Sequence, residues 1–207
     1  MLKNLLSCAL VFCSLSLLGQ NDTEELKAIE PYKVYQSWSA DMTAGLFLPL
    51  KYSLNYYGFG FFPRYNFIAP KEYLSVSAGA PMNVGLDVFV SSGGSIIQYM
   101  IDLPLVLDFN IGSRATRFDD TPFGAFLGGG LAYNFSHLTF GTANLNLHTF
   151  GPMVHGGFRW RMNGRETGVR ISYLSGFGKR SEEVNGIIVE GQPGNKILSI
   201  SVIYGIN

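Results

Sequence analysis

Nine charged residues sit at alternating positions within apolar segments of this chain, and they are its first candidates for chemistry. The acidic members are Asp41, Asp87, Asp102, Asp108 and Glu166, and the basic members are Arg64, Arg159, Arg161 and Arg170. A charge enclosed by apolar structure must be paired or hydrated, because an isolated buried ion is strongly destabilising. Every basic member is an arginine, whose rigid fork can bridge two carboxylates. We therefore predict an enclosed charge network in which Asp102 and Asp108 pair with Arg159, Arg161 or Arg170.

Three histidines, His137, His148 and His155, are the other candidates for acid–base chemistry. Catalysis by histidine uses a nearby serine or acid, placed in a defined spacing. Ser136 directly precedes His137, but no His-x-Ser spacing is present and no acid lies near either His137 or His148 in the sequence. His155 falls on a polar row, where we expect hydrogen bonds to its neighbours. The sequence therefore predicts a protein that is not an enzyme.

Metal and cofactor sites are not predicted either. His137 and His148 lack the spacing of metal ligands, and Asp119-Asp120 precedes Thr121-Pro122 in a plain turn signal. The run Gly128-Gly129-Gly130 is followed by neither a helix start nor a lysine, so it is not a phosphate-binding loop. We expect these glycines to permit tight strand packing or a bend.

The elements that position these residues are long alternating strands, of which residues 96–112 are the clearest. Every odd position from Ile97 to Ile111 is apolar, whereas the even positions include Gln98, Asp102 and Asp108. A period of two indicates a strand with two different faces. Ordinary strands run about 5–6 residues, whereas a strand that crosses a membrane at about 45° needs about 9–11. This segment is long enough to cross.

The same alternation recurs along the chain and predicts eight strands in total. The other seven lie at 38–50, 56–67, 73–90, 123–135, 150–162, 166–173 and 198–206. A soluble barrel would also alternate, with its apolar row pointing inward and a water-facing row rich in Lys, Glu and Thr. Here the second row is mostly Gly, Ser and Asn with few charges, which suits a narrow interior, while the apolar rows carry many aromatics suited to lipid. We predict an all-β fold, an eight-stranded antiparallel transmembrane β-barrel.

Composition supports this choice and excludes other classes. Only 14% of the 207 residues are charged, against about 25% in ordinary soluble domains. The 15 basic and 15 acidic residues balance, so no basic field exists to attract nucleic acid. Residues 1–20 read as a cleaved signal peptide, with Lys3 followed by an apolar run, and both cysteines lie inside it. We expect a short periplasmic tail at 21–37 and a barrel domain at 38–207.

The predicted connections differ in length on the two sides of the barrel. The joins at 69–72 and 163–166 are tight, whereas 136–149 and 178–195 read as long polar loops. Outer-membrane barrels place short turns in the periplasm and longer loops outside the cell. The join at 113–122 is longer than a periplasmic turn should be. Four prolines also interrupt the strands and are tolerated only at bulges or strand ends; they are Pro63, Pro81, Pro104 and Pro152.

Three segments carry a resemblance to a known family. These are "MIDLPLVLDFNIG", "FGAFLGGGLAYNF" and the terminal "LSISVIYGI". Together with the signal and the eight rows, they resemble the small outer-membrane β-barrels, porin-like or OmpA-like, that are common in Bacteroidetes-type bacteria. The likeness covers residues 38–207 and implies a location in the outer membrane of a Gram-negative bacterium. It also implies contact with outer-membrane lipid and the barrel-assembly machinery.

Three functions remain open at this point. The favoured one is a monomeric barrel with a filled, salt-bridged lumen and a structural or surface-interaction role, in which loops 136–149 and 178–195 meet an extracellular ligand. The second is a narrow porin-like channel whose charged lumen selects ions or small solutes. The third is an enzyme that modifies lipid A.

Overall fold

The computed structural model describes residues 34–47, 52–91, 94–116, 119–140, 143–162, 165–177, 179–184, 187–193 and 195–205. Side chains are described for most of these residues, apart from those of the first strand, of residues 179–193 and of a few strand ends. The predicted signal peptide with Cys8 and Cys13, and most of the predicted tail, lie outside the described residues. None of the described residues belongs to a helix long and apolar enough to cross a membrane.

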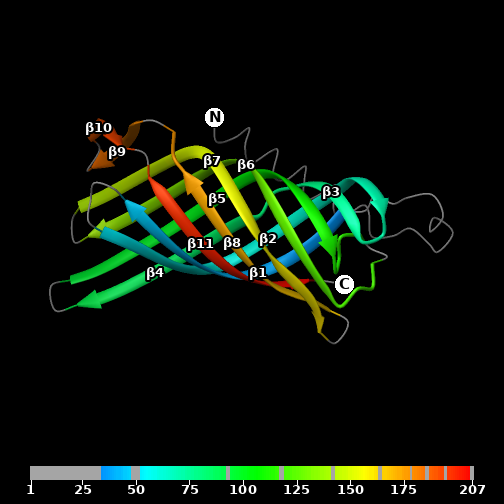
Figure 1. The fold of residues 1–207 in the computed structure, drawn as a ribbon. Helices are drawn as coiled ribbons and strands as arrows, with labels where there is room; N and C mark the ends of the chain where they lie inside the picture. The colour runs from blue at the N-terminus through cyan, green and yellow to red at the C-terminus, as the bar shows by residue number, and fades with distance from the viewer. Residues whose placement is uncertain are drawn as a thin grey trace.

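Eleven strands form one continuous sheet that closes into a barrel (Figure 1). They are β1 (Val34–Phe47), β2 (Tyr52–Lys71), β3 (Leu74–Gly79), β4 (Met82–Ser91), β5 (Gly94–Gly112), β6 (Phe123–Phe140), β7 (Ala143–Met162), β8 (Arg165–Ser175), β9 (Lys179–Val184), β10 (Ile187–Pro193) and β11 (Lys196–Gly205). β1 begins at Val34, inside the segment predicted as a tail.

The pairing order shows that the eleven strands occupy eight positions around the barrel, which we call staves. β3 and β4 together fill one position between β2 and β5. β9 and β10 form a hairpin beyond the ends of β8 and β11, and β9 also pairs with β7. The remaining pairs are antiparallel neighbours along the chain, and β1 closes the ring by pairing with β11. The predicted eight-stranded antiparallel barrel is confirmed.

The four prolines lie where their strands change partner. β2 leaves β4 at Phe61 and takes up β3 at Arg64, with Pro63 between them. β5 makes the same change across Pro104, and Pro81 lies in the gap between β3 and β4. Proline lacks the N–H that a continuous ladder requires, so these positions are the ones that tolerate it. Three of the prolines therefore mark a single break that crosses neighbouring staves.

Pro152 marks a second break, on the other side of the barrel. β7 pairs with β8 from Met153 onward and with β9 at Leu145–Leu147, so Pro152 lies between the two partners. The backbone N–H of Phe177, in the segment that joins β8 to β9, donates to the Phe150 carbonyl at 2.7 Å. The ladder is thus kept on both sides of the proline.

The outer surface is apolar along the strands, as the alternation predicts. Phe59, Leu127 and Phe158 expose 78%, 70% and 70% of their surface, whereas Phe126, one position before Leu127, exposes only 4%. So much apolar surface facing water would be unfavourable for a soluble protein. The exterior therefore matches a hydrocarbon environment, and the second face of each strand points into the lumen.

The two ends of the barrel differ. The turn end carries the tight turn at Glu72–Tyr73, the connection after β5, the end of β7 and the start of β8, together with the start of β1 and the end of β11. The hairpin end carries the tips of β4–β5 and β6–β7 and the β9–β10 hairpin (Figure 1).

The predicted loops at 136–149 and 178–195 are wrong in structure, because both segments are largely strands. β6 and β7 continue as a ladder from Asn134–Thr149 to Phe140–Ala143. In this part of the hairpin, polar residues occupy the outward face and apolar residues the inward face. The sequence therefore lacks the outward apolar row from which strands are predicted. His137, Thr139, Asn144 and Asn146 share the outward face, while Leu147 is buried and Leu138 and Leu145 pack with the interior. The segment 178–195 contains the β9–β10 hairpin.

Candidate functional site: a filled lumen

The first residues of the connection after β5 fold back into the turn end of the barrel. Residues 113–116 follow β5 through two positive-φ positions, Gly112 at 68° and Arg114 at 60°. Ser113, Ala115 and Thr116 are almost completely buried, and the Thr116 hydroxyl donates to the Glu72 carbonyl at 2.6 Å. A Cβ on Gly112 would clash with the backbone of Phe123, so this turn requires glycine. We call residues 113–116 the plug segment.

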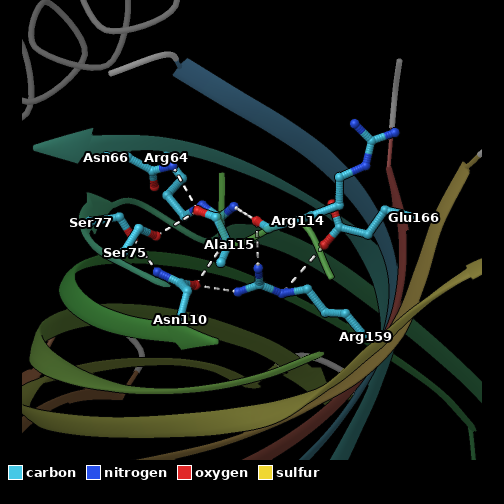
Figure 2. A network of polar contacts seen from close by, with 9 residues as sticks. All are labelled: Arg64, Asn66, Ser75, Ser77, Asn110, Arg114, Ala115, Arg159 and Glu166. Atoms are coloured by element: carbon cyan, nitrogen blue, oxygen red, sulfur yellow. Dashed lines mark hydrogen bonds and ion pairs between the residues drawn. The ribbon is translucent and has the colours of Figure 1, made fainter. Parts of the chain in front are cut away.

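The lumen side chains hold the plug segment through its carbonyl groups (Figure 2). The Asn66 amide and the Ser75 hydroxyl both donate to the Ala115 carbonyl, at 2.9 and 2.5 Å. Arg64 and Arg159 both donate to the Arg114 carbonyl, at 2.5 and 3.3 Å. Four side chains from three strands and the plug's own backbone therefore meet at this end.

Two guanidinium groups also converge on one amide oxygen. Arg64 Nη1 and Arg159 Nη2 donate to Asn110 Oδ1 at 2.8 and 2.6 Å, and Asn110 Nδ2 donates to the Ser77 hydroxyl (Figure 2). Arg159 Nε lies 3.3 Å from Glu166 Oε1, and both side chains are nearly inaccessible to solvent. The arginine forks therefore bridge an amide and a backbone carbonyl, where the sequence had suggested bridges between carboxylates.

A buried histidine–carboxylate pair lies next to this network. His155 Nε2 is 2.6 Å from Asp108 Oδ1, and neither side chain has any exposed surface. An ionised Asp108 carboxyl group would accept this hydrogen bond from the Nε2–H of the imidazole. The imidazole ring meets Phe62 and Phe126 edge-on, at centroid distances of 6.1 and 5.7 Å. Gly128 makes room for the pair, because a Cβ there would overlap Asp108 Oδ1.

An apolar layer crosses the lumen beyond this pair. It is built by Phe62, Val106, Ala132, Met153, Leu174 and Ile197, which come from six different strands. Arg170 stacks over Phe62, with its Cζ 5.5 Å from the ring centroid, and donates to Asn83 and Ser201. This arginine is among the largest fully buried side chains of the described residues.

The hairpin end of the lumen is also occupied. Asn134 donates to Asp102 and accepts a hydrogen bond from Ser136 at 2.8 Å. Tyr56, Met100 and Leu147 form a second buried apolar cluster there. On the described strands, the deeply buried arginines Arg64, Arg159 and Arg170 are matched in number by Asp102, Asp108 and Glu166, so their formal charges cancel.

The predicted charged residues divide into three groups. Arg64, Asp102, Asp108, Arg159, Glu166 and Arg170 are buried inside the barrel. Arg161 lies at the turn end, where it pairs with the exposed Asp120 at 2.7 Å, and Asp87 is half-buried opposite Gln98. Asp41 lies on β1 opposite Gly58 and Ser201, and its side chain is outside the described ones.

The predicted pairing of Asp108 with an arginine is corrected, because the side chain that contacts its carboxyl group is His155. Arg159 pairs with Glu166, and Arg161 pairs with Asp120. Sequence reasoning also missed Asn110 and Asn134 as the residues that organise the network. In the sequence, each of these asparagines is marked only by its position on the polar row of a predicted strand.

The other two histidines lie on the outside of the barrel. His137 Nδ1 is 2.5 Å from Asn146 Oδ1, and its Nε2 is 3.0 Å from the Thr139 hydroxyl. His148 Nδ1 is 2.6 Å from the Tyr133 hydroxyl. Among the described residues, no group of three or more His, Cys, Asp or Glu side chains could hold a metal ion.

Known proteins share the fold but little sequence. No protein-family model and no curated protein sequence matches the chain. Ail, the attachment invasion locus protein of Yersinia pestis, has a similar structure, with a TM-score of 0.55, 11% identity, and coverage of 86% of this chain and 98% of that chain. The complex of Ail with the heparin analogue sucrose octasulfate has a TM-score of 0.52 and 12% identity, with coverage of 86% of this chain and 98% of that chain. Neisserial surface protein A has a TM-score of 0.51 and 13% identity, with coverage of 86% of this chain and 99% of that chain.

At these identities the likeness carries the fold alone. The closed barrel of eight antiparallel staves and its apolar exterior define a β-barrel protein of the Gram-negative outer membrane.

Proposed function

We propose that this protein is a monomeric outer-membrane barrel with a filled lumen, and that its role is structural or interactive rather than catalytic. The observation that carries this proposal is the plug segment, whose carbonyls are held by four lumen side chains. Behind it lie the Asp108–His155 pair and the six-residue apolar layer, which support this proposal. An eight-stranded barrel is just wide enough for side chains to fill its interior.

The interactive surface in this proposal is the hairpin end. β6 and β7 have 18 and 20 residues, about twice the 9–11 that a tilted strand needs to cross the hydrocarbon. The β6–β7 hairpin therefore extends beyond the membrane, alongside the β9–β10 hairpin. We propose that the hairpin end faces the outside of the cell and the turn end faces the periplasm, as in other barrels with short periplasmic turns.

An epitope tag inserted between Phe140 and Ala143 tests this orientation. Antibody should bind the tag on intact cells, and external protease should remove it. A matched tag between Met162 and Arg165, at the turn end, should be reached only after the outer membrane is permeabilised. The reverse pattern would contradict the orientation.

A narrow channel is the second candidate, because six charged side chains do line the interior of the strands. In that case ions would have to pass between Arg64, Arg159 and Glu166 and then the apolar layer. A lipid-modifying enzyme is the third candidate. Replacing His137 and His148 by leucine separates it, because an enzyme would lose its effect on the acyl chains of lipid A, whereas a non-catalytic barrel would leave the lipid unchanged.

A further inference from the structure

The outward face of β5, β6 and β7 changes character near the hairpin end. There it carries a group of aromatic, imidazole, amide and hydroxyl side chains beside Ile97, which lies opposite Thr139. We call this group the rim patch, and its members are Tyr99, Tyr133, Phe135, His137, Thr139, Asn144, Asn146 and His148. All of them lie on the face opposite the lumen, since they alternate with the buried Met100, Asn134, Ser136 and Leu147.

The rim patch lies at the edge of the hydrocarbon layer. The outward apolar row of β6 runs from Phe123 to Phe135, and that of β7 runs from Met162 to Phe150. At about 3.4 Å per residue and a tilt of about 45°, each row covers roughly 29 Å along the membrane normal, close to the ~30 Å of a typical hydrocarbon core. The polar members of the patch, His137, Asn146 and His148, therefore begin where lipid headgroups begin.

Contacts within the patch fix its side chains in place. His137 stacks on Tyr99 with a centroid distance of 4.7 Å and an interplanar angle of 25°. His148 packs against Phe135 at 5.0 Å and meets the Tyr133 hydroxyl. His137 is held from both sides, by Asn146 on Nδ1 and by Thr139 on Nε2. A surface that is already ordered loses little entropy when it binds a ligand.

The chemistry of the patch matches a sugar. None of its eight members is Asp, Glu, Lys or Arg, and Glu183 of β9 lies opposite Asn146 at the edge of the patch. It offers flat aromatic faces together with amide and hydroxyl groups that can both donate and accept hydrogen bonds. A hydroxyl-rich ring with one apolar face fits both features. The aliphatic belt directly below, including Ile101 and Leu131, fits acyl chains.

We propose that the rim patch binds the sugar headgroup of a membrane glycolipid whose acyl chains lie on the apolar belt below. The position of this lipid in the outer leaflet rests on the orientation proposed above. Binding itself does not depend on orientation or on conductance, so it is measured in micelles, where its failure and the failure of the proposed function remain separate.

Native mass spectrometry of the folded protein tests the proposal, in a detergent without a sugar headgroup, because glycosidic detergents would compete. The probes are rough lipopolysaccharide, the same glycolipid after removal of its phosphates, and phosphatidylethanolamine. We expect the protein to retain both glycolipids at concentrations where phosphatidylethanolamine is lost. His137→Leu combined with Asn146→Leu should reduce the retained glycolipid about tenfold, which corresponds to about 1.4 kcal/mol.

A variant at the opposite rim is the matched control. Tyr65→Leu combined with Tyr73→Leu alters exposed aromatics at the turn end and should leave retention unchanged. Both variants should keep the heat-dependent gel shift of a folded barrel. Equal loss in the control, equal retention in the His137→Leu/Asn146→Leu variant, or retention that disappears with the phosphates would each overturn the proposal.

Discussion

The Asp108–His155 pair shows how single residues stabilise this lumen. Both side chains are fully enclosed, so neither can exchange its partner for water. Removing one member of such a pair leaves an uncompensated buried group, which costs more than the pair itself contributes. The exposed Arg161–Asp120 contact at the turn end has the opposite character, since Asp120 is 85% exposed and water can replace its partner.

Asp108→Ala should therefore destabilise the barrel by about 1–3 kcal/mol, because His155 Nε2 is left buried without its hydrogen-bond partner. Asp120→Ala removes an exposed contact of similar length, and it should lower the free energy of unfolding by only about 0–1 kcal/mol. Urea unfolding of both variants in phospholipid vesicles measures the difference. Equal effects would mean that the buried pair contributes no more than a surface contact.

Gly128 supports the same pair through its missing side chain. A Cβ at this position would overlap Asp108 Oδ1 and lie 2.8 Å from His155 Nε2. Gly128→Ala should destabilise the barrel by about 1–3 kcal/mol through overpacking. Gly129→Ala on the outward face is the control, since a Cβ there meets nothing closer than 3.2 Å. Urea unfolding that ranks Gly129→Ala as the more harmful change would contradict this packing.

At the scale of elements, the plug segment accounts for a connection that the sequence left unexplained. The 113–122 join is too long for a periplasmic turn because its first residues fold into the barrel mouth. Besides the Thr116 hydroxyl, which donates to the Glu72 carbonyl, the segment is held through its own carbonyls, by Arg64, Arg159, Asn66 and Ser75. Such contacts leave no pattern in the sequence of the segment itself.

Replacing Arg159 by methionine should loosen the plug, because it removes donors to the Arg114 carbonyl and to Asn110. Hydrogen exchange at the Ala115 amide, which donates to the Gly112 carbonyl at 2.7 Å, should become at least about tenfold faster. Exchange in the β6–β7 ladder should rise far less, although the same change removes the ion-pair partner of Glu166. Faster exchange throughout the barrel would instead indicate general destabilisation, and no change at Ala115 would show that Arg159 does not hold the plug.

At the scale of the whole molecule, the sequence predicts the barrel well where one face of each strand contacts lipid. Period-two rows such as Ile97–Ile111 predicted the eight staves and their outward faces, because the hydrocarbon demands apolar residues at every second position. The rule fails beyond the membrane, where Leu138 and Leu147 turn inward and His137 and Asn146 face outward, so strands there were read as a loop. The lumen partners, such as His155 for Asp108, depend on register across several staves and could not be read from one strand.

The filled lumen is the central claim, and single-channel conductance of the refolded protein in a planar bilayer tests it most directly. We predict no steady openings from protein that is shown by protease protection to be inserted, because in this proposal the plug segment and the layers behind it block the lumen. Steady openings whose ion preference changes when Asp102 or Arg159 is neutralised would contradict the claim. They would make the protein a channel with its selectivity in the lumen charges.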